Sequence, residues 1–206
     1  MLEREPSYAA AVFGEHGDAV RQFTANLAEH GETLGLIGPL ELPRLWTRHI
    51  VNCGLVAPLL PAGRVADVGS GAGLPGLVLA IMRPDAHLIL IEPMERRVAW
   101  LTDQARELGL SNVQVIRERA ESAGINGTCH AVTARAVSAL KTLIPLTAPL
   151  LISGGELILM KGQNAQAEID AASKQIAKYK LRDVRVEELG AVYGADITRV
   201  IRARVD

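Results

Sequence analysis

The segment from Asp67 to Gly76, DVGSGAGLPG, holds the residue types whose spacing could do chemistry. Glycine tolerates backbone conformations that bring N–H groups close to a ligand, and a glycine-rich turn between a strand and a helix is typical of nucleotide-type sites. The apolar run at 64–68 predicts a buried strand before the turn, and the run at 77–82 predicts a helix after it. The context therefore indicates a ligand-binding turn.

Two ligand classes use such a turn, and the acidic residue in front of it helps to separate them. Gly71, Gly73 and Gly76 fit the dinucleotide fingerprint, in which a pyrophosphate sits at the helix N-terminus. Asp67 stands two positions before Gly69, and a carboxylate facing the crevice would repel a pyrophosphate but attract an ammonium or sulfonium group. S-adenosylmethionine carries both an ammonium and a sulfonium group. The alternative for Asp67 is a strand-end residue that hydrogen-bonds the turn.

A second acidic residue follows the next predicted strand, at 87–91. Glu92 lies 21 residues after Gly71, a separation at which a carboxylate can accept hydrogen bonds from ribose hydroxyls. Its alternative role is to cap the helix that begins near Pro93, because acidic residues and proline are common at helix starts. The place of Glu92 at a strand end, its spacing from Gly71 and the glycine turn together favour the ribose contact.

Length and composition favour a single α/β domain, with a mostly parallel sheet between helices on both faces. The chain has 206 residues, 49% of them hydrophobic. Further strands are predicted at 113–116, 130–133, 156–160, 183–189 and 197–204, and further helices at 96–108, 138–151 and 165–181. Residues 1–60 are expected to form an N-terminal helical extension, with a helix over 42–60 that carries His49, and residues 61–206 to form the core.

The cysteines do not indicate a metal site, and the apolar runs indicate neither secretion nor a membrane span. Cys53 and Cys129 are 76 positions apart, without metal-ligand spacing, and are expected to be small buried residues. We find no basic-plus-apolar leader and no apolar run long enough to span a bilayer. The expectation is a cytoplasmic protein that binds no metal and contacts no membrane.

The formal net charge of −1 hides an uneven distribution. Residues 1–43 carry 2 basic and 7 acidic side chains, whereas residues 44–206 carry 20 basic and 16 acidic ones. Arg119, Arg135 and Lys161 follow or end predicted strands, where the ligand crevice of an α/β sheet lies. These three are interpreted as site residues, and the lysines of the late helix as a solvated face.

Several short motifs carry a resemblance to a known family. They are the glycine segment with its Leu-Pro-Gly ending, Arg48-His49-Ile50, Arg119-Ala120-Glu121, Ala134-Arg135-Ala136 and Met160-Lys161-Gly162. Together they resemble the bacterial small-subunit ribosomal RNA guanine-N7 methyltransferases, the glucose-inhibited division protein B family, from about residue 44 to 162. The alternating glycines alone would indicate only the broader class I, Rossmann-like methyltransferases.

The resemblance implies S-adenosylmethionine as cofactor and 16S ribosomal RNA, within the small ribosomal subunit, as partner, with no obligatory protein partner. The residues expected at the cofactor are Asp67, Gly69, Gly71, Gly73, Leu74, Glu92, Ala120, Glu121 and Arg135. Those expected at the RNA are Arg48, Arg119, Arg135 and Lys161. Arg135 and Lys161 are also expected to act in catalysis.

The implied chemistry agrees with what the fourth predicted strand lacks. Guanine N7 carries a lone pair and no proton, so methyl transfer to it needs placement and desolvation but no general base. An exocyclic amine acceptor would call for an Asn/Asp-Pro-Pro-aromatic motif at the strand end, where this chain has Arg135. Two alternatives stay open: a methyltransferase with a non-RNA acceptor, and a nicotinamide-dependent oxidoreductase.

Overall fold

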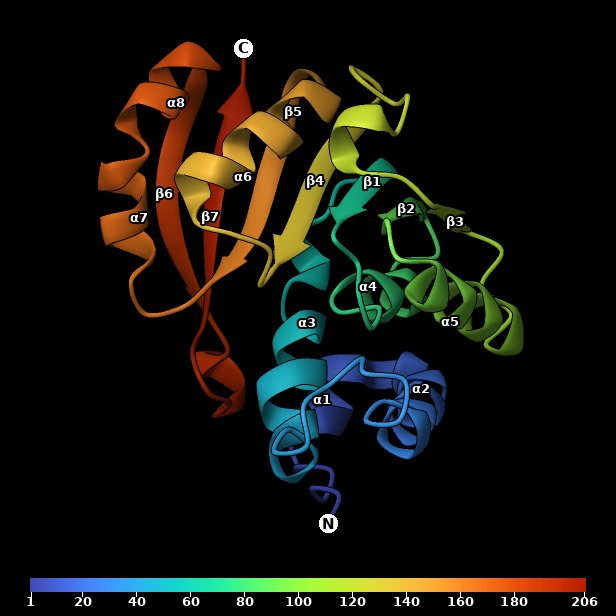
Figure 1. The fold of residues 1–206 in the computed structure, drawn as a ribbon. Helices are drawn as coiled ribbons and strands as arrows, with labels where there is room; N and C mark the ends of the chain where they lie inside the picture. The colour runs from blue at the N-terminus through green and yellow to red at the C-terminus, as the bar shows by residue number, and fades with distance from the viewer.

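Seven strands form one sheet in the order β3-β2-β1-β4-β5-β7-β6 (Figure 1). The computed structural model describes residues 1–206. The strands are β1 Gly63–Val68, β2 Ala86–Ile91, β3 Val113–Ile116, β4 Cys129–Arg135, β5 Leu151–Lys161, β6 Leu181–Leu189 and β7 Thr198–Val205. Strands β1 to β5 pair in parallel, and β7 runs antiparallel to β5 and β6. The seven-stranded, mostly parallel sheet is confirmed.

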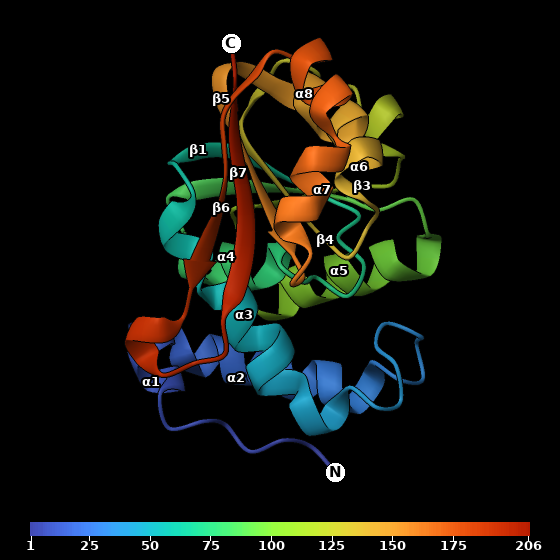
Figure 2. The same cartoon turned by 90° about the vertical axis from the view of Figure 1, so that its left-hand side faces the viewer.

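Helices cover both faces of this sheet (Figures 1 and 2). The α-helices are α1 Ala9–Phe13, α2 Gly17–His30, α3 Asn52–Gly54, α4 Gly76–Met82, α5 Glu95–Glu107, α6 Leu140–Thr147, α7 Ala165–Ala171 and α8 Ser173–Lys178. Because side chains alternate along a strand, Val65 and Leu88 join a core with α4 and α5, whereas Ala66 and Ile89 join a second core with α6. The strands are thereby buried on both faces, which explains their continuous apolar sequences.

The N-terminal helices lie below the sheet in Figure 1, close to α4. Their side chains belong to the same core as β1, because Phe13, Phe23 and Trp46 are buried in one cluster with Val65. The rings of Phe13 and Trp46 pack 6.3 Å apart at an interplanar angle of 60°. The extension is thus held to the sheet by apolar contact.

The prediction of one regular helix over 42–60 is wrong. A 3-10 turn at Leu42–Arg44 leads into π-helical turns at Leu45–Val51, then into α3 and a further 3-10 turn at Ala57–Leu59. Proline in the first turn of each 3-10 segment fits a segment start but interrupts a longer helix. The segment therefore places its side chains at spacings that a regular helix would not give.

Three other boundaries differ from the sequence expectation. The helix expected at 138–151 spans only Leu140–Thr147, and a 3-10 turn containing Pro149 follows it. β5 begins at Leu151, so the glycine pair before Glu156 lies within the strand, beside a register shift against β4. The helix expected at 165–181 is divided at the buried Ala172 into α7 and α8. None of the eight helices is long and apolar enough to cross a membrane.

Candidate active site

The glycine turn between β1 and α4 has a backbone that only glycine adopts without strain. Gly69, Gly71 and Gly73 have φ angles of 72°, 53° and 92°. A Cβ at Gly73 would lie 2.4 Å from Leu77 Cδ1, so both conformation and space exclude a side chain there. Leu74, which is buried, ends the turn two residues before α4 begins at Gly76.

Asp67 lies at the base of this turn and is fully buried. Its Oδ2 accepts a hydrogen bond from the Gly76 N–H at 3.1 Å, while its Oδ1 is buried without a partner in the protein. Burial raises the pKa of Asp67 to about 7, against the opposing effects of the Ser70 hydroxyl and of the hydrogen bond from Gly76. The carboxylate thus holds the N-terminus of α4, where a dinucleotide would place its pyrophosphate. This contact disfavours the nicotinamide alternative.

Glu92 follows β2 and uses both carboxylate oxygens on the backbone. Its Oε2 accepts from the Gly71 N–H and its Oε1 from the Met94 N–H, each at 3.0 Å. Met94 is the residue before α5, so the capping role that the sequence left open is present in the structure. The ribose contact of Glu92 stays a prediction.

The segment expected near the adenine lies after β3, at the same edge of the sheet. Ala120 is buried and begins a 3-10 turn at Ala120–Ser122, whereas Arg119 and Glu121 are exposed. The structure therefore brings the apolar side of this turn toward the protein and leaves its charged neighbours in solvent.

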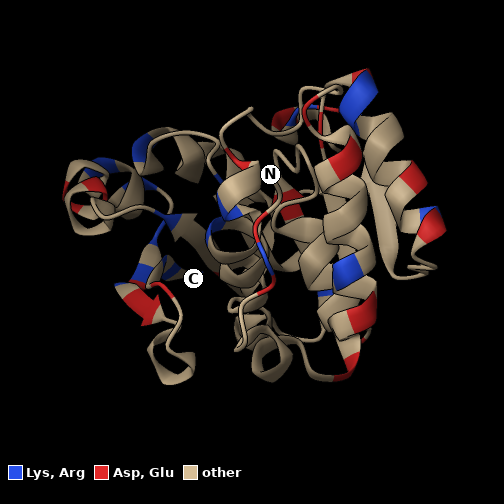
Figure 3. Cartoon of the chain, turned by 90° about the horizontal axis from the view of Figure 1, so that it is seen from below, with Lys and Arg blue, Asp and Glu red and all other residues tan.

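A cavity of about 1080 Å³ opens at the carboxyl ends of β4 and β5. It brings together Arg48, Arg135 and Lys161, which the sequence analysis assigned to RNA, but Arg119 does not line it. The charged side chains of the lining are Arg44, Arg48, Arg135, Lys161, Arg199, Glu168 and Asp196. Basic groups outnumber acidic ones in this lining, and Figure 3 shows Lys and Arg segments at the centre and left of the view from below, with acidic segments among them and further basic segments on the right. The cavity suits an anionic ligand.

Arg135 ends β4 and is half-buried between the sheet and the N-terminal extension. Its Nη2 lies 2.6 Å from His49 Nδ1 and 3.4 Å from the carbonyl oxygen of Arg48. Its Nη1 lies 3.7 Å from Cys53 Sγ. Burial raises the pKa of the Cys53 thiol to about 11, so this cysteine is a buried neutral group, as expected.

His49 has a carboxylate partner that sequence reasoning missed. Glu41 Oε2 lies 2.5 Å from His49 Nε2, and Glu41 also binds Arg44 at 2.7 Å. This contact could not be predicted from the sequence, because Glu41 precedes the helix expected over 42–60 and lies eight positions from His49. The succession of 3-10 and π-helical turns permits the contact.

Lys161 ends β5 and is held in a polar cluster, with 8% of its side chain exposed. Its Nζ donates to Glu168 Oε2 at 2.8 Å and to the carbonyl oxygen of Ser138 at 2.7 Å. Glu168 Oε2 also accepts the Leu140 N–H at 2.7 Å. Lys161 thus fixes the loop between β4 and α6, which forms one wall of the cavity.

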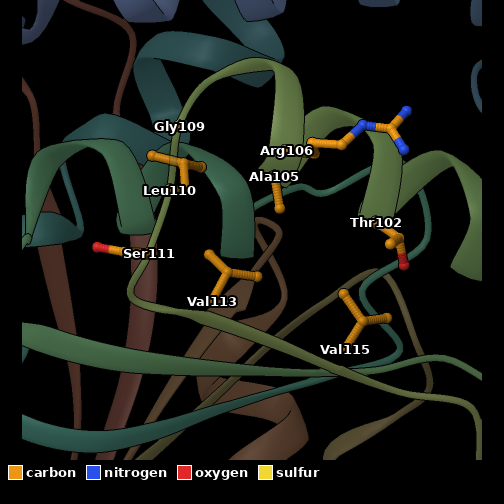
Figure 4. A pocket seen from close by; sticks show the side chains of 8 residues that line it. All are labelled: Thr102, Ala105, Arg106, Gly109, Leu110, Ser111, Val113 and Val115. Carbon is orange, nitrogen blue, oxygen red and sulfur yellow. The ribbon is translucent and has the colours of Figure 1, made fainter.

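A smaller hollow of about 490 Å³ lies between α5 and β3 (Figure 4). Val113, which begins β3, and Gly109 line it, so it lies toward the amino end of the strand. The glycine turn and the basic cavity lie at the opposite edge. This hollow is therefore separate from the candidate site.

Comparison with known sequences identifies the family. The profile described as rRNA small subunit methyltransferase G matches residues 17–196. The chain is 61% identical to the ribosomal RNA small subunit methyltransferase G of Leifsonia xyli, over 99% of this chain and 98% of that protein. It is 59% identical to the protein of the same name from Clavibacter michiganensis, over 100% of this chain and 97% of that protein. The chain belongs to this family. It is an enzyme, a methyltransferase that uses S-adenosylmethionine.

Solved structures of other proteins share this fold. A TYW2 protein of M. jannaschii, solved in complex with S-adenosylmethionine, aligns with a TM-score of 0.62 at 18% identity, covering 79% of this chain and 78% of that one. A tRNA methyltransferase of Aquifex aeolicus aligns with a TM-score of 0.58 at 16% identity, covering 75% and 68%. The fold is that of the class I methyltransferases, as the sequence analysis expected.

Buried polar atoms at the glycine turn fit this cofactor. The β1–β4 register pairs Asp67 with Thr133, and both Asp67 Oδ1 and Thr133 Oγ1 are buried without hydrogen-bond partners. Buried polar groups in proteins are nearly always satisfied, so these two oxygens require partners from a bound ligand or from water. A free carboxylate oxygen suits the ammonium of the methionine moiety.

Proposed function

We propose that this methyltransferase transfers the methyl group of S-adenosylmethionine to N7 of one guanine in 16S ribosomal RNA, within the small ribosomal subunit in the cytoplasm. The observation that carries the proposal is the position of Arg135, which ends β4 next to the glycine turn and lines the basic cavity. The family relationship, with relatives named as ribosomal RNA small subunit methyltransferases, supports the RNA substrate.

The chemistry needs placement more than proton transfer. S-adenosylmethionine supplies an electrophilic methyl group on a sulfonium, and guanine N7 offers a lone pair with no proton to remove. Arg135 has a planar fork of N–H donors, which can bind the O6 edge of guanine or a phosphate. We assign it the role of holding the acceptor base. The sequence predicts Lys161 in catalysis and at the RNA, but because its Nζ is held by Ser138 and Glu168 we assign it the role of holding the cavity wall around that base.

For the cofactor, we propose that Asp67 receives the ammonium and Glu92 the ribose. The orphaned oxygen of Asp67 and the place of Glu92 at the end of β2 support these assignments. The turn residues Gly69, Gly71, Gly73 and Leu74, the segment Ala120–Glu121 and Arg135 complete the proposed cofactor site. Because Glu92 already binds two backbone N–H groups, its remaining lone pairs would serve the ribose.

For RNA, we propose that exposed arginines around the cavity bind phosphates. Arg48 is exposed on its rim and forms no ion pair, and Arg119 is exposed and unpaired after β3. Free guanidinium groups bind phosphate oxygens without first breaking an internal ion pair. We further propose that residues 1–206 work as one methyltransferase domain, because residues 1–60 share a core with the sheet.

Methyl transfer with labelled S-adenosylmethionine tests the proposal. The acceptors are naked ribosomal RNA, isolated small subunits and whole ribosomes from cells that lack this enzyme, followed by strand cleavage at N7-methylguanine. The expected result is one cleavage site in 16S RNA. Cofactor binding without incorporation into any RNA would overturn the RNA substrate and indicate a non-RNA acceptor.

A further inference from the structure

A chain of polar contacts links the N-terminal extension to Arg135. Arg135 Nη2 lies 2.6 Å from His49 Nδ1, and His49 Nε2 lies 2.5 Å from Glu41 Oε2. An arginine side chain has donors only and a carboxylate has acceptors only. The imidazole must therefore accept at Nδ1 and donate at Nε2. These contacts select one neutral tautomer of His49.

Glu41 lies at the end of this series of contacts and is ionised. Its two oxygens accept from Arg44 Nε at 3.1 Å and Nη2 at 2.7 Å, in addition to His49. Burial alone would raise the pKa of Glu41, but the hydrogen bonds from Arg44 and His49 outweigh it and lower that pKa to about 2. The carboxylate at the far end of these contacts is therefore ionised throughout the neutral pH range.

The surroundings of His49 oppose a second proton on its ring. Its side chain is 12% exposed. The charged groups that face it are Arg135 from β4, Arg48 from its own segment and Glu41, which is itself paired with Arg44. Burial and the charge of Arg135 lower the pKa of His49, against the opposing effect of Glu41.

We propose that His49 is a positioning residue, whose neutral imidazole holds the guanidinium of Arg135 in the orientation that receives the acceptor base. A proton on Nδ1 would set a donor against the donors of Arg135 and release that side chain. The proposal rests on the role of Arg135 in the proposed function. It gives the N-terminal extension a direct part in the reaction, because both His49 and Glu41 lie outside the strands and helices that carry the glycine turn.

Two substitutions of His49 separate its contact with Arg135 from its contact with Glu41. In His49→Asn, the side-chain amide oxygen can occupy the place of Nδ1 and accept from Arg135, but the asparagine side chain is too short to reach Glu41. In His49→Gln, the amide can reach the place of Nε2 and bind Glu41, but it leaves Arg135 unsupported. Loss of a hydrogen bond to a charged group typically costs on the order of 10- to 100-fold. We expect kcat for RNA methylation to fall by about that factor in His49→Gln and to remain about tenfold higher in His49→Asn.

Three further readouts distinguish positioning from a structural role. The affinity for S-adenosylmethionine, measured at each pH to account for Asp67, is expected to change much less than kcat in both variants, because Arg135 is one of many proposed cofactor contacts. The wild-type kcat is expected to fall as the pH falls through the lowered pKa of His49, and this fall is expected to be absent in His49→Asn. In nitrogen-15 spectra of the wild-type protein without RNA, His49 is expected to carry its proton on Nε2.

Equal kcat values in the two variants, or the same acidic fall in His49→Asn as in the wild type, would overturn the proposal. A proton on Nδ1 at neutral pH would overturn it as well. Failure of the proposed function has a different appearance, because the wild-type enzyme would then methylate no RNA. In that case the tautomer measured by nitrogen-15 spectroscopy would still decide whether His49 supports Arg135.

Discussion

The carboxylate of Asp67, at the end of β1, closes the N-terminus of α4 by accepting the Gly76 N–H at 3.1 Å. The same carboxylate is fully buried and keeps a second oxygen without a partner. A single side chain thus joins strand to helix and offers an acceptor at the proposed cofactor site. A neutral side chain at position 67 is therefore expected to raise the stability of the protein and to lower its affinity for the ligand.

The first prediction concerns the stability of Asp67→Asn. Burial raises the pKa of Asp67 from 3.8 to about 7, so its contribution to stability is fully present below pH 3.8 and lost as the pH rises through about 7. The uncharged amide avoids this loss and can still accept from Gly76. We expect the variant to be more stable than the wild type at pH 8, by on the order of 2–4 kcal/mol, in denaturant unfolding without cofactor. A stability difference that does not change between pH 5 and pH 8 would contradict the prediction.

The same variant is expected to bind S-adenosylmethionine more weakly. An amide cannot form the ion pair that the buried carboxylate offers to the ligand's ammonium, so affinity at pH 8 is expected to fall on the order of 10-fold or more. Isothermal titration calorimetry measures this directly. Unchanged affinity in the folded Asp67→Asn protein would remove Asp67 from the cofactor site.

Gly76 is predicted to be irreplaceable because of what lies against it. A Cβ there would lie 2.5 Å from Asp67 Oδ2 and 2.4 Å from Leu90 Cδ2, both fully buried. We expect Gly76→Ala to cost about 1–3 kcal/mol of unfolding free energy. The matched control is Gly162→Ala, because no atom lies within 4 Å of a Cβ built at Gly162. Equal thermal midpoints for the two variants would show that the packing around α4 yields to a methyl group.

The sequence predicted most strands correctly because each is an apolar run ended by a polar or glycine residue. β3 was placed at its observed bounds, and the carboxyl ends that carry Asp67, Glu92 and Arg135 followed from the strands. The acidic residue after β2 was also recognised at the correct spacing, although its contacts in the structure are with the backbone. Local patterns sufficed here because strand ends in a parallel sheet meet at one edge.

The contacts around Arg135 could not be predicted in the same way. Glu41 stands just before the helix expected over 42–60, and a regular helix would carry His49 about 10 Å along its axis from Leu42. The irregular turns of residues 42–51 bring the two together, and hydrophobic periodicity does not encode such turns. The pair of Lys161 and Glu168 likewise depends on how α7 folds back onto β5, which is tertiary information.

Lys161 and Glu168 provide a prediction that separates structure from RNA contact. The side chains are 8% and 26% exposed, so Lys161→Met is expected to leave a partly buried carboxylate unpaired and to cost about 1–3 kcal/mol. The double variant Lys161→Met with Glu168→Gln is expected to recover most of that loss in thermal unfolding. If Lys161 only holds the cavity wall, the double variant also recovers the KM for RNA. A KM that stays raised after stability returns would assign Lys161 a direct RNA contact.

The exposed arginines are predicted to act through charge alone. Arg48 on the cavity rim and Arg119 after β3 form no ion pairs, so Arg48→Ala and Arg119→Ala are expected to leave stability unchanged. Each phosphate contact removed lowers the slope of log affinity against log salt by about 0.7–0.9. RNA binding measured between low and moderate salt is therefore expected to lose about that slope in each variant. Lys174→Ala, on α8 and away from the cavity, serves as the matched control and is expected to keep the wild-type slope. A wild-type slope in Arg119→Ala, with a reduced one in Arg48→Ala, would confine the RNA contact to the cavity that Arg135 lines.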